Sequence, residues 1–279
     1  MNDMTDHWAF SANTGFLWPE LGFLERLERA ASLGFSTVEF HDEAQREDPA
    51  IVRARLDANG LAVAGLNVAM GDTAGRAALA GEEAGAREDI LRAIEVAEAV
   101  GAAAVHVLSG RTGESASGLP IGTSAASGRS SSDESAARAR YAEALRFALE
   151  RSSLVVLIEP LCSEAAPGYH VDSFDKAVSL IEEIAHPRLK IMFDCFHAGH
   201  IESDIGAAFE RLAAHVGHVQ IASFPARAEP SAGGIDYATL LPAMRRAGYT
   251  GAFGCEYRQQ GSDAADRAWR ESLPPPPAS

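Results

Sequence analysis

The stretch LGFSTVEF, residues 33–40, runs from the end of an amphipathic segment through a glycine into a short β-branched and aromatic run. Glycine adopts the left-handed backbone conformation that commonly ends a helix, and the run after it is typical of a strand. AGYTGAFGCEY, residues 247–257, repeats this order, and VGAAAVHVL, residues 100–108, is a looser third copy. The repetition predicts a chain built from successive helix and strand units.

Apolar, β-branched runs alternate with alanine-rich amphipathic stretches along the whole chain. The runs predicted as strands are 7–13, 37–41, 63–68, 103–109, 154–159, 190–194, 218–222 and 252–257. Each is followed by a predicted helix, and these include 21–33, 87–100, 134–150, 174–185, 206–216 and 237–247. Eight such units in about 250 residues indicate a single (β/α)₈ TIM barrel. A doubly wound open sheet is disfavoured because no glycine-rich nucleotide motif follows the first strand.

The barrel is predicted to be one domain that covers residues 1–272. Residues 111–133 are rich in glycine and serine and have almost no apolar pattern, so we predict a long flexible loop on the catalytic face. The tail LPPPPAS, residues 273–279, is predicted to be disordered.

Composition limits the partners that this chain can have. Its 279 residues carry a formal net charge of −15, which repels phosphate backbones and argues against nucleic acid. No apolar run approaches the roughly 20 residues that cross a bilayer, and the N-terminus lacks an apolar signal segment. The 3 cysteines fit a reducing cytoplasm. We therefore predict a cytoplasmic protein with a small-molecule partner, and the sequence leaves a homo-oligomer open.

Polar residues stand at the ends of four predicted strands, where a TIM barrel builds its active site. They are Glu159, Asp194, Gln220 and Glu256. Carboxylates that lie close together repel each other and retain protons unless a cation compensates them. A set of oxygen ligands suits Mg²⁺ or Mn²⁺ better than Zn²⁺, and Co²⁺ is also compatible.

Each of these residues also has a structural interpretation. A single acid at a strand end is often a helix N-cap, and a buried glutamine can simply hydrogen-bond its neighbours. Four polar strand ends at one barrel mouth are harder to explain in this way, which favours a metal site. His218 lies two residues before Gln220 and deeper in the barrel, so we predict a hydrogen-bonded core histidine there.

FDCFHAGH, residues 193–200, combines an acid, a thiol and two histidines. His197 could be a metal ligand or could bind a substrate oxygen, and the second role is favoured because the acids already supply ligands. Cys195 should point away from Asp194 because neighbours on a strand face opposite sides, which argues against a Cys–His nucleophile pair. His200 is predicted to lie in a loop.

Ten ordered segments carry a family resemblance: FSANTGFLWPE, GFSTVEF, GDTAG, SGRTG, LIEP, PGYH, FDCFH, HVQIA, RAEP and GCEY. From about Phe10 to about Tyr257 the chain resembles the hydroxypyruvate isomerase family. That family belongs to the xylose-isomerase-like barrel group of sugar isomerases and 3-epimerases.

The resemblance implies a metal-dependent isomerase with one divalent ion held by the four strand-end residues. It further implies that Glu159 and Glu256 are the catalytic acid/base pair on opposite sides of the substrate. His197 and Arg227 would bind substrate oxygens, with Glu39 in a supporting position near the site. From its place after the seventh strand alone, Arg227 is either a solvated surface arginine or an anion or hydroxyl binder.

The sequence departs from the family at several positions on the catalytic face. Ser223 and Phe224 replace an expected Asp-Asn pair, Gly234 replaces a glutamate, and residues 161–163 read LCS. The substrate is therefore open, and so are a ketose 3-epimerase, a polyol dehydratase and a non-catalytic sugar-binding barrel.

Two further enzyme classes on this barrel are disfavoured. A Schiff-base aldolase needs a buried lysine at the site, but Lys176 falls in a predicted helix and Lys190 at the wrong end of a strand. An apurinic endonuclease needs more histidines and a basic DNA-binding face, which the charge of −15 opposes.

Overall fold

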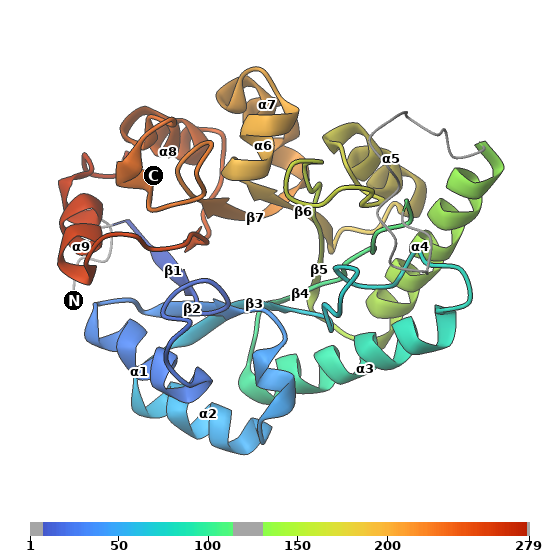
Figure 1. Ribbon diagram of the computed structural model, residues 1–279, viewed down its shortest axis with the longest axis horizontal. Coiled ribbons are helices and arrows are strands. Elements are labelled where there is room, and N and C mark those ends of the chain that lie inside the picture. The colour runs from blue at the N-terminus through green and yellow to red at the C-terminus, as the bar shows by residue number, and fades with distance from the viewer. Residues whose placement is uncertain (1–7, 114–130, 278–279) are drawn as a thin grey trace.

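The computed structural model describes residues 8–113 and 131–277. Parallel strands close into a barrel in sequence order, with helices around the outside (Figure 1). The strands are β1 (Phe10–Asn13), β2 (Thr37–Phe40), β3 (Ala62–Asn67), β4 (Ala104–His106), β5 (Val155–Ile158), β6 (Leu189–Asp194), β7 (Val216–Ile221) and β8 (Phe253–Cys255). β8 pairs back onto β1 with Phe10 opposite Phe253. The predicted (β/α)₈ barrel is confirmed.

The helices alternate with the strands in the described part of the chain. They are α1 (Phe23–Ser32), α2 (Pro49–Ala58), α3 (Glu83–Val100), α4 (Ser131–Arg151), α5 (Phe174–Ile184), α6 (Cys195–Ile201), α7 (Ile205–Leu212), α8 (Tyr237–Arg246) and α9 (Asp263–Ser272). Short 3₁₀ turns are η1 (Glu43–Arg46), η2 (Ala213–His215) and η3 (Pro230–Ala232). Val216 and Gly217 begin β7, whereas the sequence placed Val216 at the end of a helix.

The three related stretches in the sequence have the same backbone course. Gly34, Gly101 and Gly248 follow α1, α3 and α8 with φ of 82°, 72° and 99°, the left-handed conformation that glycine adopts without a Cβ clash. In each case the chain then turns directly into the next strand. The predicted helix, glycine and strand unit is therefore confirmed.

Side chains inside the barrel form layers because alternate residues of a strand point to the same face. Ala104, Leu157 and Met192 make a small apolar cluster within the barrel. The residues two positions further along the same strands, towards their carboxyl ends, are polar: His106, Glu159 and Asp194. An apolar layer thus lies beneath a polar one, and the polar layer faces the catalytic end.

Two segments that the sequence predicts to be irregular are only partly included in the described residues. Most of the predicted loop 111–133 lies outside the described residues, but Ser131–Asp133 belong to α4, so the helix begins earlier than predicted. In the tail, residues 273–277 have no helix or strand, and the Pro274 carbonyl accepts a hydrogen bond from Trp8 Nε1 at 2.6 Å. Disorder of this tail stays a prediction. Among the described residues, none of the helices is both long and apolar enough to cross a membrane.

Phe193 on β6 packs outward between the barrel and its helices. Its ring stacks on Phe174 of α5 at 5.0 Å and meets Phe209 of α7 edge-on at 5.3 Å. We expect Phe193→Ala to lower the free energy of unfolding by about 3–5 kcal/mol through the lost burial and the cavity left behind. Leu91→Ala, at a side chain 39% exposed, is the control and should cost much less in the same urea titration. Equal losses would show that Phe193 does not anchor these helices.

Candidate active site

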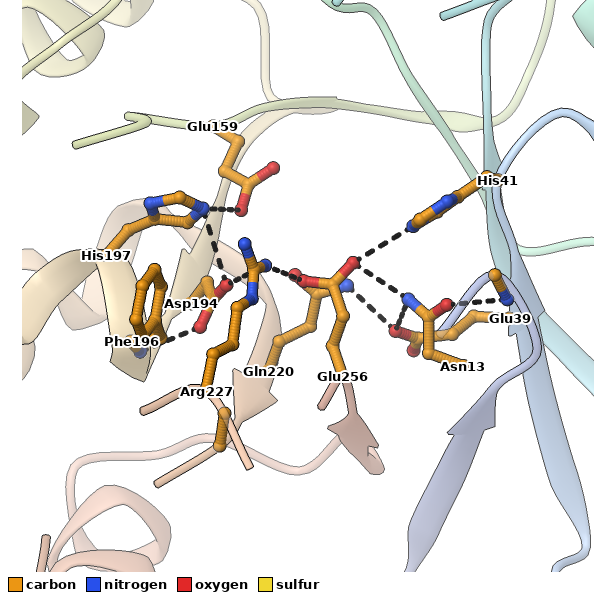
Figure 2. Close-up of polar contacts among 12 residues, drawn as sticks. Asn13, Glu39, His41, Glu159, Asp194, Phe196, His197, Gln220, Arg227 and Glu256 are labelled. Atoms are coloured by element: carbon orange, nitrogen blue, oxygen red, sulfur yellow. Dashed lines mark hydrogen bonds and ion pairs between the residues drawn. The ribbon is translucent and has the colours of Figure 1, made fainter. Parts of the chain in front are cut away.

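Every strand of the barrel contributes one buried polar side chain at or within one residue of its carboxyl end. We call this set the polar ring: Asn13, Glu39, Asn67, His106, Glu159, Asp194, Gln220 and Glu256. Most of its members are seen converging in Figure 2. The four predicted ligands all belong to it, and they come from β5 to β8.

Part of the predicted ligand set lies close enough to share a metal ion. One ligand atom each from Glu159, Asp194 and His197 falls within 4.8 Å of the others. Glu159 Oε1 and Gln220 Oε1 are buried and have no hydrogen-bond partner among the described residues. Buried oxygens without a donor are what a cation would satisfy, so these residues fit a divalent metal. Glu256 is outside this close group.

Arg227 is inside the site and not at the surface. Its Nη2 donates to Asp194 Oδ2 at 2.8 Å and to Glu256 Oε2 at 2.6 Å (Figure 2). The guanidinium carbon lies 4.7 Å from the Phe16 ring centroid and 4.8 Å from that of Phe196. Of the two roles left open by the sequence, the solvated surface arginine is therefore wrong.

The loop that carries Arg227 is closed by one of the residues that depart from the family. Ser223 donates its N–H to the Ala228 carbonyl at 2.8 Å, and its hydroxyl accepts from Ala228 N at 2.9 Å. Arg227 adopts a left-handed φ of 52° within this turn. At Gly234 an added Cβ would lie 1.7 Å from the Phe224 carbonyl oxygen, so the chain has no room for a glutamate there. The two departures are parts of one local structure.

Burial and charge separate the proton affinities of the three acids. Burial, with repulsion from Glu256 and Asp194, raises the pKa of Glu159 well above its usual value. Burial also raises the pKa of Asp194 to about 7, against the opposing charge of Arg227. Burial would raise the pKa of Glu256 too, but Arg227 and a hydrogen bond from His41 outweigh it and lower that pKa. Without a metal, Glu256 thus favours its ionised form, and Glu159 has the greater affinity for a proton.

Asp194 has the capping role that the sequence considered, and it also pairs with Arg227. Its Oδ1 caps α6 by accepting from Phe196 N at 2.8 Å, while Oδ2 faces Arg227. The helix begins at once after β6 because Asp194 caps it, so the predicted loop at His200 is wrong. Cys195 is fully buried at the first position of α6, and burial raises the pKa of its thiol, which leaves no accessible nucleophile.

His197 projects from α6 with a defined tautomer. The backbone N–H of Cys162 donates to its Nδ1 at 3.1 Å, so the ring proton resides on Nε2. Burial and the charge of Arg227 lower its pKa, which keeps the ring neutral. Nε2 lies 3.6 Å from Asp194 Oδ2 and 3.9 Å from Glu159 Oε1. His197 therefore presents an N–H donor to the site, as a substrate-binding role requires.

Glu39 holds the other half of the site together. It accepts from Gln220 Nε2 at 2.8 Å, from Asn13 Nδ2 at 3.1 Å and from His218 Nε2 at 2.6 Å. Because the Gln220 amide N–H is bound to Glu39, its oxygen is the atom left for a ligand. His218 is a hydrogen-bonded core residue, in agreement with the sequence analysis. Asn13 Nδ2 also donates to Glu256 Oε1 at 2.9 Å and so links Glu39 to the site.

Several site residues were missed by sequence reasoning. His41 Nε2 lies 3.2 Å from Glu256 Oε1, and His106 Nδ1 lies 3.8 Å from Glu159 Oε2. Asn13 and Asn67 were missed as well. Position could have found Asn13, which ends a predicted strand, and Asn67, which lies one residue before the end of another. His106 falls in the middle of the predicted strand 103–109, because β4 ends earlier than predicted.

A family model described as a xylose isomerase-like TIM barrel matches residues 27–274. The chain belongs to this family. Relatives within it include a 2-oxo-tetronate isomerase from Cupriavidus necator, 37% identical over 93% of this chain and 96% of that protein. A hydroxypyruvate isomerase from Escherichia coli is 32% identical over 94% of this chain and 98% of that protein. These relatives confirm the predicted enzyme class, an isomerase, and the predicted resemblance.

Solved structures of other proteins superpose closely on this fold. One described as AP endonuclease, family 2, from Brucella melitensis superposes with a TM-score of 0.83 at 30% identity, over 94% of this chain and 97% of that one. The apo form of a 3-keto-D-glucoside 4-epimerase from E. coli gives 0.75 at 24% identity, over 95% and 97%. The second likeness concerns the fold alone.

The raised pKa of Glu159 affects stability in the metal-free protein. Above the usual glutamate pKa of about 4.3 the unfolded chain releases a proton that folded Glu159 retains. Stability therefore falls as pH rises through this range. Glu159→Gln has no such proton, so its Tm should exceed that of the wild type by about 2–8 °C at pH 8.

This stability difference should shrink towards pH 4, and thermal denaturation in EDTA at both pH values measures it. The control is Glu98→Gln, the same chemical change at an exposed position on α3. A difference between Glu159→Gln and the wild type that is the same at pH 4 and pH 8 would contradict the prediction.

Proposed function

We propose that the protein is a divalent-metal-dependent isomerase of a small hydroxy-oxo acid. The observation that carries the proposal is the convergence of the buried carboxylates of Glu159, Asp194 and Glu256 at the barrel mouth, where oxygens of Glu159 and Gln220 have no hydrogen bond. Carboxylates in such a site can hold a divalent metal and move a proton between neighbouring carbons. The names of two relatives, 2-oxo-tetronate isomerase and hydroxypyruvate isomerase, support a small oxo acid as substrate.

The metal would be held by Glu159, Asp194, Gln220 and Glu256. When bound, Mg²⁺, Mn²⁺ or Co²⁺ would polarise the substrate carbonyl as a Lewis acid. The unpartnered oxygens of Glu159 and Gln220 support this set. Glu39 keeps the Gln220 amide turned so that the oxygen, and not the N–H, is free.

In the reaction, ionised Glu256 removes the proton from the carbon next to the carbonyl. The C–H electrons form the carbon–carbon double bond of an enediolate, and negative charge develops on the former carbonyl oxygen. His197 Nε2–H and the Arg227 guanidinium stabilise that charge by donating to it. Glu159 or Glu256 then returns a proton to the former carbonyl carbon. The hydroxyl proton passes to the former carbonyl oxygen, so the carbon that lost its hydrogen becomes the new carbonyl and the isomerisation is complete. Burial of the ring residues keeps water from quenching the intermediate.

We do not propose an endonuclease activity, although one similar solved structure, from Brucella melitensis, is described as an AP endonuclease. A net charge of −15 disfavours a DNA substrate. A cytoplasmic location and a homo-oligomeric state stay predictions.

A substrate screen in D₂O tests the proposal. The protein is stripped with EDTA, and Mg²⁺, Mn²⁺ or Co²⁺ is added back. Hydroxypyruvate, 2-oxo-tetronate and D-fructose are then followed by NMR. We expect an oxo acid to be isomerised with solvent deuterium entering the product carbon, and this to disappear in EDTA. Turnover of the ketose alone, or turnover that EDTA leaves unchanged, would contradict the proposal.

Removal of either glutamate should abolish turnover. Glu159→Gln and Glu256→Gln keep the side-chain size but cannot exchange a proton, so kcat should fall by about 10²–10⁴-fold in each. The rate is measured on the oxo acid identified in the screen, with Glu98→Gln as the matched control on α3. Near wild-type rates in both single variants would rule out this acid/base pair.

A further inference from the structure

His106 is a member of the polar ring to which the mechanism gives no role. It is 1% exposed at the carboxyl end of β4. Ala104, two residues earlier on the same strand face, packs inside the barrel, so the imidazole also points inward. Nδ1 lies 3.8 Å from Glu159 Oε2, which places the ring beside the proposed acid.

A neighbouring amide determines the tautomer of His106. Asn67 Oδ1 lies 3.1 Å from Nδ1, while Asn67 Nδ2 faces the sulfur of Met70 at 3.7 Å. An amide oxygen can only accept, so Nδ1 carries the proton and Nε2 has a free lone pair.

The Nε2 atom of His106 is a buried acceptor that has no partner among the described residues. Most buried polar atoms in folded proteins are hydrogen-bonded, so an unmatched one at an active site suggests that a ligand supplies the donor. His106 lies outside the close group of candidate metal-ligand atoms, which Glu159, Asp194 and His197 form.

We propose that His106 Nε2 accepts a hydrogen bond from a substrate hydroxyl group and thereby selects substrates that carry one next to the carbonyl. The inference rests on the proposed function. His197 and His106 lie beside different oxygens of the Glu159 carboxyl group. His197 Nε2, which bears the N–H, is 3.9 Å from Oε1, and His106 Nδ1 is 3.8 Å from Oε2. A donor suits a carbonyl oxygen and an acceptor suits a hydroxyl, so the two rings together match a hydroxy-oxo pair. A dicarbonyl or deoxy compound would leave Nε2 unpaired.

Two substitutions of His106 separate its two nitrogens. The side-chain amide of His106→Asn ends near the position of Nδ1, so it retains a bond to Asn67 but has no atom at Nε2. His106→Gln extends to the position of Nε2 and can present an oxygen there. Asn67→Leu leaves His106 in place but removes the acceptor that holds its tautomer.

The ligands for the test are tartronate and malonate, which differ by one hydroxyl group. Their dissociation constants are measured by calorimetry on the metal-loaded protein, which requires no turnover. We expect the wild type and His106→Gln to bind tartronate at least about tenfold more tightly than malonate. In His106→Asn and Asn67→Leu that preference should be lost, with malonate affinity unchanged. His215→Asn, on η2, is the control and should retain the preference.

Two results would overturn the inference. One is a tartronate preference that is unchanged in both His106→Asn and Asn67→Leu. The other is loss of Mn²⁺ binding in a titration of His106→Asn, which would make His106 a metal ligand. Failure of the isomerase proposal is seen separately, because it appears as absence of turnover in the wild-type protein.

Discussion

Three of the four carboxylates buried in the polar ring are the constraint on which the rest of the site depends. Glu159, Asp194 and Glu256 lose their hydration at the barrel mouth, and each disfavours the charge of the others. Arg227 supplies one positive charge and contacts two of them. The third, Glu159, has an oxygen without a hydrogen bond, and burial and its acidic neighbours raise its pKa. One positive charge cannot balance three carboxylates in their ionised forms, which is the physical basis for proposing a divalent metal.

The fold makes this crowding possible. Parallel strands around a closed barrel bring their carboxyl ends to one mouth, and the two-residue period of each strand selects which side chain enters it. The apolar cluster of Ala104, Leu157 and Met192 lies beneath the polar ring and closes it from below. Phe16 and Phe196 cover the Arg227 guanidinium from above. The acids are thus held where water contributes little to their solvation, so their proton affinities are set by neighbouring side chains.

The acids of the polar ring were easier to predict from the sequence than its amides and its histidine. Glu159, Asp194 and Glu256 stand out because an acid after an apolar strand needs an explanation. Asn13, Asn67 and His106 do not stand out, because buried amides and neutral histidines commonly form hydrogen bonds with their neighbours in protein interiors. Arg227 could not be placed from the sequence because its position depends on a turn closed by Ser223, which local propensity does not reveal. The end of β6 at Asp194 was predicted correctly, but the segment after it was predicted as a loop, whereas α6 begins there with Asp194 as its N-cap.

The sequence by itself determined the barrel, the order of its strands and the polar residues at the ends of β5 to β8. These follow from hydrophobic period, glycine positions and strand ends, all of which are local properties of the chain. Only the tertiary structure decided the proton affinity of each acid, the orientation of the Gln220 amide, and which ring nitrogen of His106 and of His197 carries the proton. Those depend on partners far away in sequence, such as Glu39 for Gln220 and Cys162 for His197, which close packing alone brings within hydrogen-bonding distance.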